Sequence, residues 1–286
     1  MKSILITGAS SGIGRATALR FANRNWRVFA AVRKEADAQK LHAHTHGKLE
    51  TILLDITDRA SIEAAAGEVG RRLNGGRGLD GLFNNAGIGD TSPVEYTPLG
   101  QLREIFEINL FAQIAVIQAF LPMIRAAKGR ILNSGSVGDY LPLPFGGALA
   151  GSKAAFASMS AALRLELRPQ GIEVSILEPG AIDTPAVDKT LGHVEQTIAG
   201  WPREAIQLYA EPMRQMARAF ARKEHSGSRP EVVAEVVERA FTDRHPRTRY
   251  PAGKDSVRLP LLARFLPEKL LDVAILKNFG LSGSAG

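Results

Sequence analysis

Short apolar segments alternate with longer segments of helical spacing along the first two-thirds of the chain. Helical spacing joins Ile13, Ala16, Leu19 and Ala22, and further helices are predicted for residues 58–73, 99–127 and 151–168. Strands are predicted where four to six apolar residues end at a glycine or a polar residue, in segments 3–7, 27–32, 49–54, 79–83, 130–133 and 172–177. This alternation predicts an α/β fold with a doubly wound parallel sheet covered on both faces.

The boundaries of these elements carry their own signals. Asp58 is a predicted N-cap for the helix that runs to about Leu73, and Pro122 predicts a kink in the long helix 99–127. Beyond Thr184 the pattern is mostly helical until a last strand at Arg249-Tyr250. No linker or internal repeat divides the chain, so we predict a single domain over residues 1–286. Its part 185–286 is predicted to include a helical substrate lid and C-terminal helices.

Composition excludes several classes of protein. The chain has 286 residues, 45% of them hydrophobic, and a formal net charge of +7 from 36 Lys and Arg against 29 Asp and Glu. With no cysteine, it has neither a disulfide framework nor a Cys-ligated metal. Basic residues alternate with acidic ones, as in the segment 218–224, which does not favour a nucleic-acid partner.

Targeting signals are weak in the sequence. No uninterrupted apolar run reaches the roughly 18 residues that a transmembrane segment needs. Residues 1–6 are too few for a signal peptide before Gly8 interrupts them. We therefore expect a cytoplasmic protein with no transmembrane segment.

A glycine-rich turn follows the first predicted strand. It reads Thr7-Gly8-Ala9-Ser10-Ser11-Gly12-Ile13-Gly14 and opens a predicted helix. Glycines let the backbone approach a pyrophosphate, and the helix N-terminus offers N–H groups and the positive end of its dipole. This strand–turn–helix context predicts dinucleotide binding.

The octet resembles the short-chain dehydrogenase/reductase family, and the resemblance continues along the chain. Further family motifs are Asn84-Asn85-Ala86-Gly87, Asn109, Ser134-Gly135-Ser136 and the segment from Pro179 to Thr184. Residues 249–253 look like the last strand of the steroid and retinol dehydrogenase-like branch. The resemblance implies a Rossmann-like sheet of seven parallel strands ordered 3-2-1-4-5-6-7 and a homo-oligomer, either a dimer or a tetramer. It also implies interconversion of a ketone and a secondary alcohol.

The resemblance carries over a set of cofactor-binding residues. They are Gly8, Ser10, Ser11, Gly12, Ile13, Gly14, Arg33, Asp55, Ile56, Asn85, Ala86, Gly87, Lys153, Pro179, Gly180, Ile182 and Thr184. At the end of the second strand an acidic residue selects NAD(H), but this chain has Val32 followed by Arg33 and Lys34. An arginine can pair with a 2′-phosphate, so we predict NADP(H) rather than NAD(H) as the cofactor.

The family's proton-transfer tyrosine has no counterpart here. Asn109, Ser136 and Lys153 match three of the four catalytic positions, but Leu149 occupies the Tyr position, four residues before Lys153. In the family pattern the nearby cation lowers the pKa of the tyrosine. Leucine cannot donate a proton, and losing a general acid costs about 10²–10⁴ in rate.

Four explanations of Leu149 are open. The residue is an introduced substitution that makes an inactivated active-site mutant, which we favour because Lys153 is retained. Alternatively it is a natural loss, leaving a catalytically silent NADP(H)-binding protein. Another group, of which Tyr140 is the best candidate, has replaced the tyrosine, or the scaffold now performs non-redox chemistry.

Three further segments bear on ligands and partners. Leu143, Phe145 and Ala148 predict an apolar pocket wall suited to a small lipophilic carbonyl or alcohol substrate. His42, His44 and His46 lack a nearby acidic partner, so no metal site is predicted. The amphipathic segment 259–279 predicts a lid, a dimer contact or a membrane-surface helix, and we favour the lid.

Overall fold

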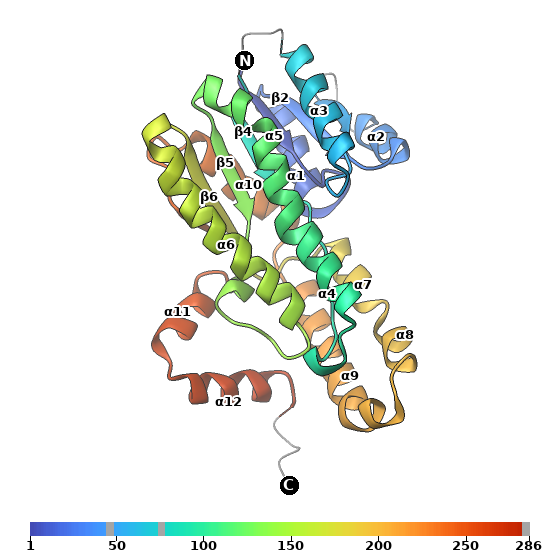
Figure 1. Cartoon of the computed structure of the whole chain (residues 1–286). Coiled ribbons are helices and arrows are strands. Elements are labelled where there is room, and N and C mark those ends of the chain that lie inside the picture. The colour runs from blue at the N-terminus through green and yellow to red at the C-terminus, as the bar shows by residue number, and fades with distance from the viewer. Residues whose placement is uncertain (44–48, 74–77, 282–286) are drawn as a thin grey trace.

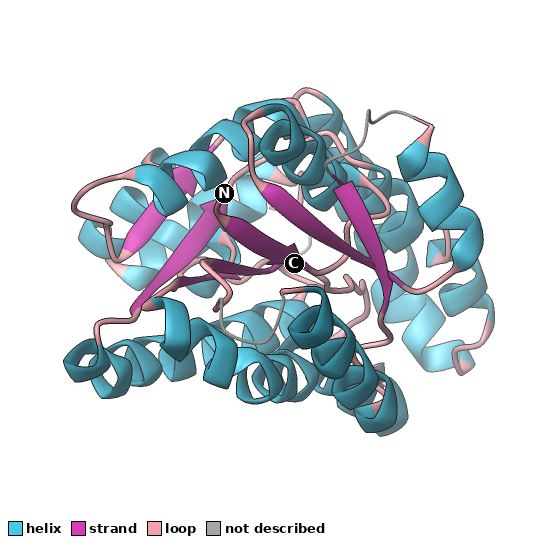
Figure 2. Ribbon diagram, turned by 90° about the horizontal axis from the view of Figure 1, so that it is seen from above, coloured by secondary structure: helices cyan, strands magenta, loops and turns pink. Residues whose placement is uncertain are grey.

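The computed structural model describes residues 1–43, 49–73 and 78–281. Seven strands form one sheet in the order β3-β2-β1-β4-β5-β6-β7, and every neighbouring pair is parallel, which confirms the predicted order. Helices cover both faces of the sheet (Figure 2). The strands are β1 Ser3–Ile6, β2 Arg27–Val32, β3 Leu49–Leu53, β4 Gly81–Asn84, β5 Arg130–Ser134, β6 Glu173–Pro179 and β7 Arg249–Ala252.

Side chains on alternate positions of the strands enter two separate cores. In β1, Ile4 and Ile6 face one core while Leu5 faces the other, because successive strand residues point to opposite faces. The first core is completed by α1 (Gly12–Asn23), α2 (Glu35–His42) and α10 (Pro230–Thr242). The second is completed by α3 (Arg59–Arg72), α5 (Ala112–Ala127) and α6 (Gly147–Leu167). The sheet is buried on both faces, as the continuous apolar strands predict.

Several boundaries differ from the sequence prediction. Helix α2 was not predicted, because only Ala38 and Leu41 of its eight residues are buried and the hydrophobic period is too short to detect. Helix α6 begins at Gly147, four residues before the predicted start, because two consecutive glycines look like a helix breaker in sequence. The predicted N-cap is confirmed, since the Asp58 carboxylate accepts a 3.0 Å hydrogen bond from the N–H of Ala60.

The long helix from residue 99 to 127 consists of three parts. Helix α4 (Leu99–Phe106) passes through a π-turn, η2 (Glu107–Phe111), into α5. The helix continues through Pro122, and an irregular turn that the sequence did not predict lies earlier, at the π-turn. The stretch is long and apolar enough to cross a membrane by composition. However, its inner face packs into the core through Ile105, Val116, Ile117, Phe120 and Ile124.

The region after β6 is mostly helical, as predicted. Helices α7 to α9 lie together at the lower end of the molecule in Figure 1, near α4, and α11 and α12 lie beside them at the outside. Their bounds are α7 Pro185–Leu191, α8 Val194–Ala199, α9 Arg203–His225, α11 Arg258–Phe265 and α12 Glu268–Asn278. Short 3₁₀ turns lie at η1 Val94–Tyr96, η3 Val137–Asp139 and η4 Arg168–Gln170.

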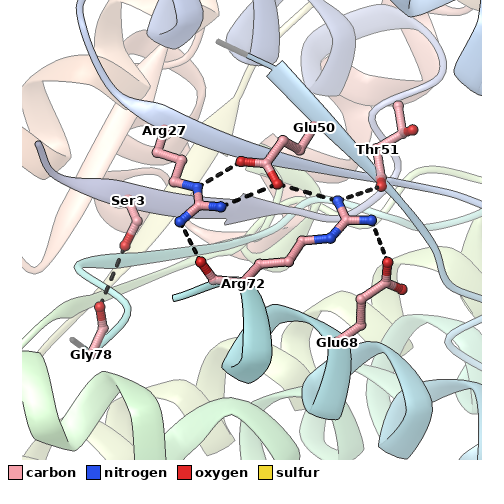
Figure 3. A network of polar contacts seen from close by, with 7 residues as sticks. All are labelled: Ser3, Arg27, Glu50, Thr51, Glu68, Arg72 and Gly78. Carbon is pink, nitrogen blue, oxygen red and sulfur yellow. Dashed lines mark hydrogen bonds and ion pairs between the residues drawn. The ribbon is translucent and has the colours of Figure 1, made fainter. Parts of the chain in front are cut away.

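An ion-pair network fixes the amino ends of β2 and β3 (Figure 3). The Arg27 guanidinium donates to Glu50 at 2.6 Å and to the carbonyl oxygen of Arg72 at 2.5 Å. Arg72, in the last turn of α3, also donates to Glu50 at 3.3 Å and to Glu68. Through Arg72 this network holds α3 to the sheet. Because it lies at the edge opposite the carboxyl ends of the strands, it leaves the ligand-binding edge open.

Candidate active site

A pocket of about 760 Å³ lies at the carboxyl ends of the strands. The ends of β1, β2, β4 and β5 contribute to it, together with α6 and the lid helices α7 and α9. In open α/β sheets this edge is where ligands bind. Among the predicted site residues it collects Gly8, Ser10, Ser11, Gly12, Ile13, Arg33, Asp55, Ile56, Asn85, Ala86, Gly87, Ser136, Leu149, Lys153 and Thr184.

In the glycine turn after β1, the backbone leaves no room for a side chain at Gly8 and Gly14. Gly8 has a φ of +65°, and a methyl group added there would lie 2.9 Å from Cα of Ala86. A methyl group at Gly14 would lie 2.2 Å from the carbonyl oxygen of Gly8. Thr7 fastens the turn to the end of β4, since its Oγ1 accepts hydrogen bonds from the N–H groups of Asn85 and Ala86 at 2.9 and 3.0 Å. The turn is therefore rigid, with α1 opening into the pocket directly after it.

Basic side chains gather at the end of the pocket nearest β2. Arg33 and Lys34 line it directly after Val32, and Lys40 of α2 joins them. One carboxylate that sequence reasoning missed, Asp37, also lies here, because α2 was not predicted. Even with Asp55, which interacts electrostatically with Arg33, three cations face two acids here, so this end of the pocket keeps a positive excess that favours a phosphate.

Asp55 lines the pocket from the turn after β3. Its Oδ1 accepts hydrogen bonds of 2.9 and 2.7 Å from the N–H and hydroxyl of Thr57. These bonds, led by the one from the backbone, hold the pKa of Asp55 below its usual value. The helix cap is the separate residue Asp58, so Asp55 presents an ionised carboxylate beside Ile56 in the pocket.

Lys153 lies at the other end of the pocket. Its Nζ donates a 2.7 Å hydrogen bond to the carbonyl oxygen of Ser134. A methyl group on Gly87 would lie 3.6 Å from this Nζ and 3.1 Å from Oδ1 of Asn109, so the ammonium sits beside the end of β4. Leu149 lines the same pocket one helical turn earlier, and Ser136 lines it from the end of β5. The structure therefore brings together three of the four predicted catalytic positions.

Asn109 has a different place. It is fully buried in the π-turn, where its Oδ1 accepts from the N–H of Ile88 at 2.9 Å. Its Nδ2 donates to the carbonyl oxygen of Ile88 at 3.0 Å and to Oγ of Ser152 at 3.1 Å. Asn109 thus joins the loop after β4 to α6, and its side chain does not line the pocket.

Burial and one carboxylate set the charge of Lys153. Burial lowers its pKa to about 8, and the negative charge of Asp139 opposes that change. Burial also raises the pKa of Asp139 to about 6, although Lys153 opposes it. Both carboxylate oxygens of Asp139 are buried, with no hydrogen-bond partner among the described residues. The ammonium and this carboxylate therefore depend on each other for their charged states.

Tyr140 is turned away from the pocket. Its hydroxyl donates a 2.8 Å hydrogen bond to Glu178 of β6, and Arg249 of β7 lies 5.0 Å above its ring. Burial and the Glu178 carboxylate raise the pKa of Tyr140 to about 12. A phenol that holds its proton this firmly and does not line the pocket is a poor replacement for the missing general acid, contrary to the hypothesis from sequence.

Five predicted site residues do not line the pocket. Gly14, Asn109, Pro179, Gly180 and Ile182 shape its walls from behind. Close packing explains two of them: a methyl group on Gly180 would lie 1.9 Å from the carbonyl oxygen of Lys254, and Ile182 is 3% exposed within the core.

Lid residues that sequence reasoning did not single out complete the pocket. They are Ala186, Val187, Lys189 and Thr190 of α7, and Phe220 and Glu224 of α9. Glu224 accepts a 3.1 Å hydrogen bond from the N–H of Ile182, and burial raises its pKa to about 7. The sequence held one signal that these two lid residues share a side of a helix: the i, i+4 spacing of Phe220 and Glu224.

No metal centre emerges from the described parts of the chain. They contain no cluster of three or more His, Asp or Glu side chains that could hold a metal ion. His42 ends α2, with its Nε2 3.1 Å from Oγ1 of Thr51, whereas His44 and His46 lie outside the described residues.

The sheet order and the glycine turn together define a nucleotide-binding α/β fold. The model of the short-chain dehydrogenase family matches residues 2–194. The chain therefore belongs to the short-chain dehydrogenase/reductase family, whose members are oxidoreductases acting on CH–OH and C=O groups.

Individual relatives place the chain in the steroid and retinol dehydrogenase branch. Retinol dehydrogenase 7 of Rattus norvegicus is 34% identical over 96% of this chain and 87% of its own. An NADPH-dependent 3-dehydrocapnine reductase of Ornithobacterium rhinotracheale is 30% identical over 97% of each chain. A short-chain dehydrogenase structure from Streptomyces avermitilis superposes with a TM-score of 0.73, at 28% identity over 98% of this chain and 97% of that one.

Proposed function

We propose that this chain binds NADP(H) and interconverts a lipophilic ketone and a secondary alcohol, with turnover impaired at Leu149. The observation that carries the proposal is the retention of Lys153 and Ser136 around Leu149 in one pocket. Everything in this arrangement except the proton donor matches the family pattern. The proposal holds whether Leu149 was introduced or arose naturally.

The pocket fits a dinucleotide phosphate. Gly8 and Gly14 leave no room for a side chain at their positions, and α1 begins at Gly12, so a pyrophosphate would lie against backbone N–H groups. Arg33, Lys34 and Lys40 would hold a 2′-phosphate at the opposite end. The NADPH-dependent relative supports this cofactor for the present chain. When bound, the nicotinamide supplies or accepts the hydride.

Lys153 and Ser136 would prepare the carbonyl group without completing its reduction. Reduction adds a hydride to the carbonyl carbon and a proton to the oxygen. Ser136 lines the pocket and can donate a hydrogen bond to that oxygen, while the ammonium of Lys153 favours negative charge nearby. At position 149 the leucine side chain has no proton to give, so the alkoxide must find a proton elsewhere.

Glu224 is a second candidate for that proton. It lines the same pocket as Leu149, and its pKa of about 7 suits proton transfer at neutral pH. On this alternative the enzyme is active as it stands. Under the other alternative, a silent NADP(H)-binding protein, no residue supplies the proton and the nucleotide has only a regulatory role.

An apolar wall supports a lipophilic substrate. Phe220 of α9 lines the pocket and packs in one cluster with Leu143 and Phe145. Phe145 also contacts Tyr209, with ring centroids 6.3 Å apart. Leu143, Phe145 and Ala148, which the sequence predicts as the wall, do not line the pocket themselves, so an apolar ketone would meet Phe220 with Ile88, Ile108, Leu149 and Val187. The retinol and steroid dehydrogenase relatives support this substrate class.

Assembly and location complete the proposal. Phe111 of the π-turn and Met159 and Leu165 of α6 are exposed by 57, 46 and 63%, which supports a homo-oligomer. We also propose a cytoplasmic location, as the sequence analysis predicts. Size-exclusion chromatography with light scattering tests the assembly.

Turnover distinguishes the three alternatives. The test follows NADPH oxidation on a panel of lipophilic ketones with the chain as it stands, with Leu149→Tyr and with Glu224→Gln. We expect turnover only for Leu149→Tyr. Turnover of the unmodified chain that Glu224→Gln abolishes would favour Glu224 as the acid, and no turnover by any of the three would favour the silent binder.

A further inference from the structure

Helix α11 presents an apolar face with basic borders to solvent. Val257, Leu261 and Phe265 are exposed by 58, 50 and 73% and lie along one side of the helix. They line a shallow hollow of about 520 Å³ together with Arg258, Leu262 and Leu266. Arg258 and Arg264 fall on the same side at 100° per residue, and no acidic residue occurs between Arg258 and Phe265.

Helix α12 repeats this pattern. Leu270, Val273 and Leu276 are exposed by 57, 60 and 38%, and the exposed Lys269 and Lys277 share their side of the helix. Its acidic residues, Glu268 and Asp272, fall on the opposite side with Ile275 and Phe279. On this one side, each helix therefore exposes three large apolar and two basic side chains with no acidic residue between them, while Glu268 and Asp272 are exposed on the other side of α12.

The inner side of α12 is attached to the substrate lid. Phe279, just after α12, is 4% exposed and packs on Met216 and Ala219 of α9. Lys223 of α9 also lies 4.9 Å above its ring. Ile275 belongs to the same cluster, which includes Phe220 of the pocket wall. The outer apolar face of α12 thus lies on a helix whose inner side packs against the roof of the active site, and α11 directly precedes it in the chain (Figure 1).

We propose that the outer faces of α11 and α12 dock the protein on an anionic lipid surface. The six apolar side chains would enter the headgroup region, while the four cations would extend to lipid phosphates on their flexible stems. This occupant follows from the charge pattern. A second copy bound through the same face would bring four cations against four cations, whereas an anionic bilayer attracts all of them.

The test is co-sedimentation of the full chain with vesicles. We expect binding to phosphatidylcholine vesicles that contain about 30 mol % phosphatidylglycerol, at least ~10-fold tighter than to phosphatidylcholine alone and weakened by salt. Lys269→Glu with Lys277→Glu, and separately Phe265→Asp with Val273→Asp, should each weaken binding at least ~10-fold. Val232→Asp, a similar change at an exposed site on α10, should leave binding unchanged.

The readout is independent of catalysis, and NADPH titration checks that each variant folds. No binding to anionic vesicles, or equal binding by all variants, would overturn the proposal. The proposal would also be overturned, in favour of self-association, by two results together. The chain would not bind vesicles, and it would form a concentration-dependent dimer that Phe265→Asp with Val273→Asp disrupts.

Discussion

Lys153 on α6 donates a 2.7 Å hydrogen bond from its Nζ to the carbonyl oxygen of Ser134 at the end of β5. This bond holds the ammonium beside Gly87, where it lines the pocket. Replacing Lys153 by Met removes the charge and leaves the carbonyl without its donor. Lys153 lines the pocket, and a charge-assisted hydrogen bond from its ammonium to the cofactor would contribute about 1.5–3 kcal/mol, so we expect Lys153→Met to weaken NADPH binding at least ~10-fold in a fluorescence titration.

Lys189 provides the matched control for this change. It lines the same pocket from α7, but it is exposed to solvent. Lys189→Met should weaken NADPH binding much less than Lys153→Met. Equal losses of NADPH affinity in both variants would mean that the positive charge of any pocket lysine attracts the cofactor, and that the position of Lys153 is not important.

Arg33 is expected to select the phosphorylated cofactor. It is exposed at the end of β2 and lines the pocket, so its removal should not disturb the core. A charge-assisted bond to the 2′-phosphate predicts that Arg33→Ala weakens NADPH binding about 10-fold while NADH binding stays unchanged. Calorimetric titration with both nucleotides measures this, with the exposed Arg59→Ala as control; parallel losses for NADPH and NADH would exclude the role.

Asp139 should control the alkaline limit of activity through Lys153. The ammonium, with a pKa of about 8, is charged below that pH and neutral above it. In the Leu149→Tyr variant, kcat/KM should therefore fall as the pH rises through about 8. Asp139→Asn removes the charge that supports the ammonium and should move this limb to lower pH. A pH profile with the same limb in both variants would contradict the coupling.

The buried carboxylate of Asp139 also predicts a pH dependence of stability. Its pKa rises from 3.8 in the unfolded chain to about 6 in the fold, so the folded state binds more protons between these values. The contribution of this group to stability is thus greatest at acid pH and is lost as the pH rises through that window. We expect Asp139→Asn to raise the free energy of unfolding by about 2 kcal/mol at pH 8 and to change little near pH 3.

Urea unfolding of both proteins at the two pH values measures this difference. A destabilised Asp139→Asn protein at pH 8 would show that the carboxylate has a stabilising partner. Equal gains at both pH values would show that shape and not charge decides the effect.

Local signals predicted the sheet and the phosphate turn. Short, largely apolar runs became β1 to β6, although Glu50 and Thr51 interrupt β3 and Ser175 interrupts β6, and Gly8 and Gly14 stand where the backbone has no room for a side chain. Lys153 and the Leu149 position were predicted from the resemblance to the family pattern, in which one helical turn separates the two residues on one helix face. Such features depend on neighbouring residues, so the sequence shows them directly.

Contacts between distant segments could not be predicted in the same way. Glu224 reaches the pocket by bonding to Ile182, 42 residues earlier, and nothing local indicates that contact. Tyr140 follows Ser136 closely, yet Glu178 of β6 draws its hydroxyl away from the pocket. Asn109 matched a family position, but whether it lines the pocket or supports it depends on Ile88 and Ser152.

The most direct test compares Leu149→Tyr with Leu149→Phe. Both variants place an aromatic ring at the same point of the pocket, and they differ only in the hydroxyl that can carry the proton. If the missing acid limits turnover, ketone reduction by Leu149→Tyr should be at least ~10²-fold faster than by Leu149→Phe or the unmodified chain, with similar NADPH affinity in all three. Equal rates for the Tyr and Phe variants would contradict the account.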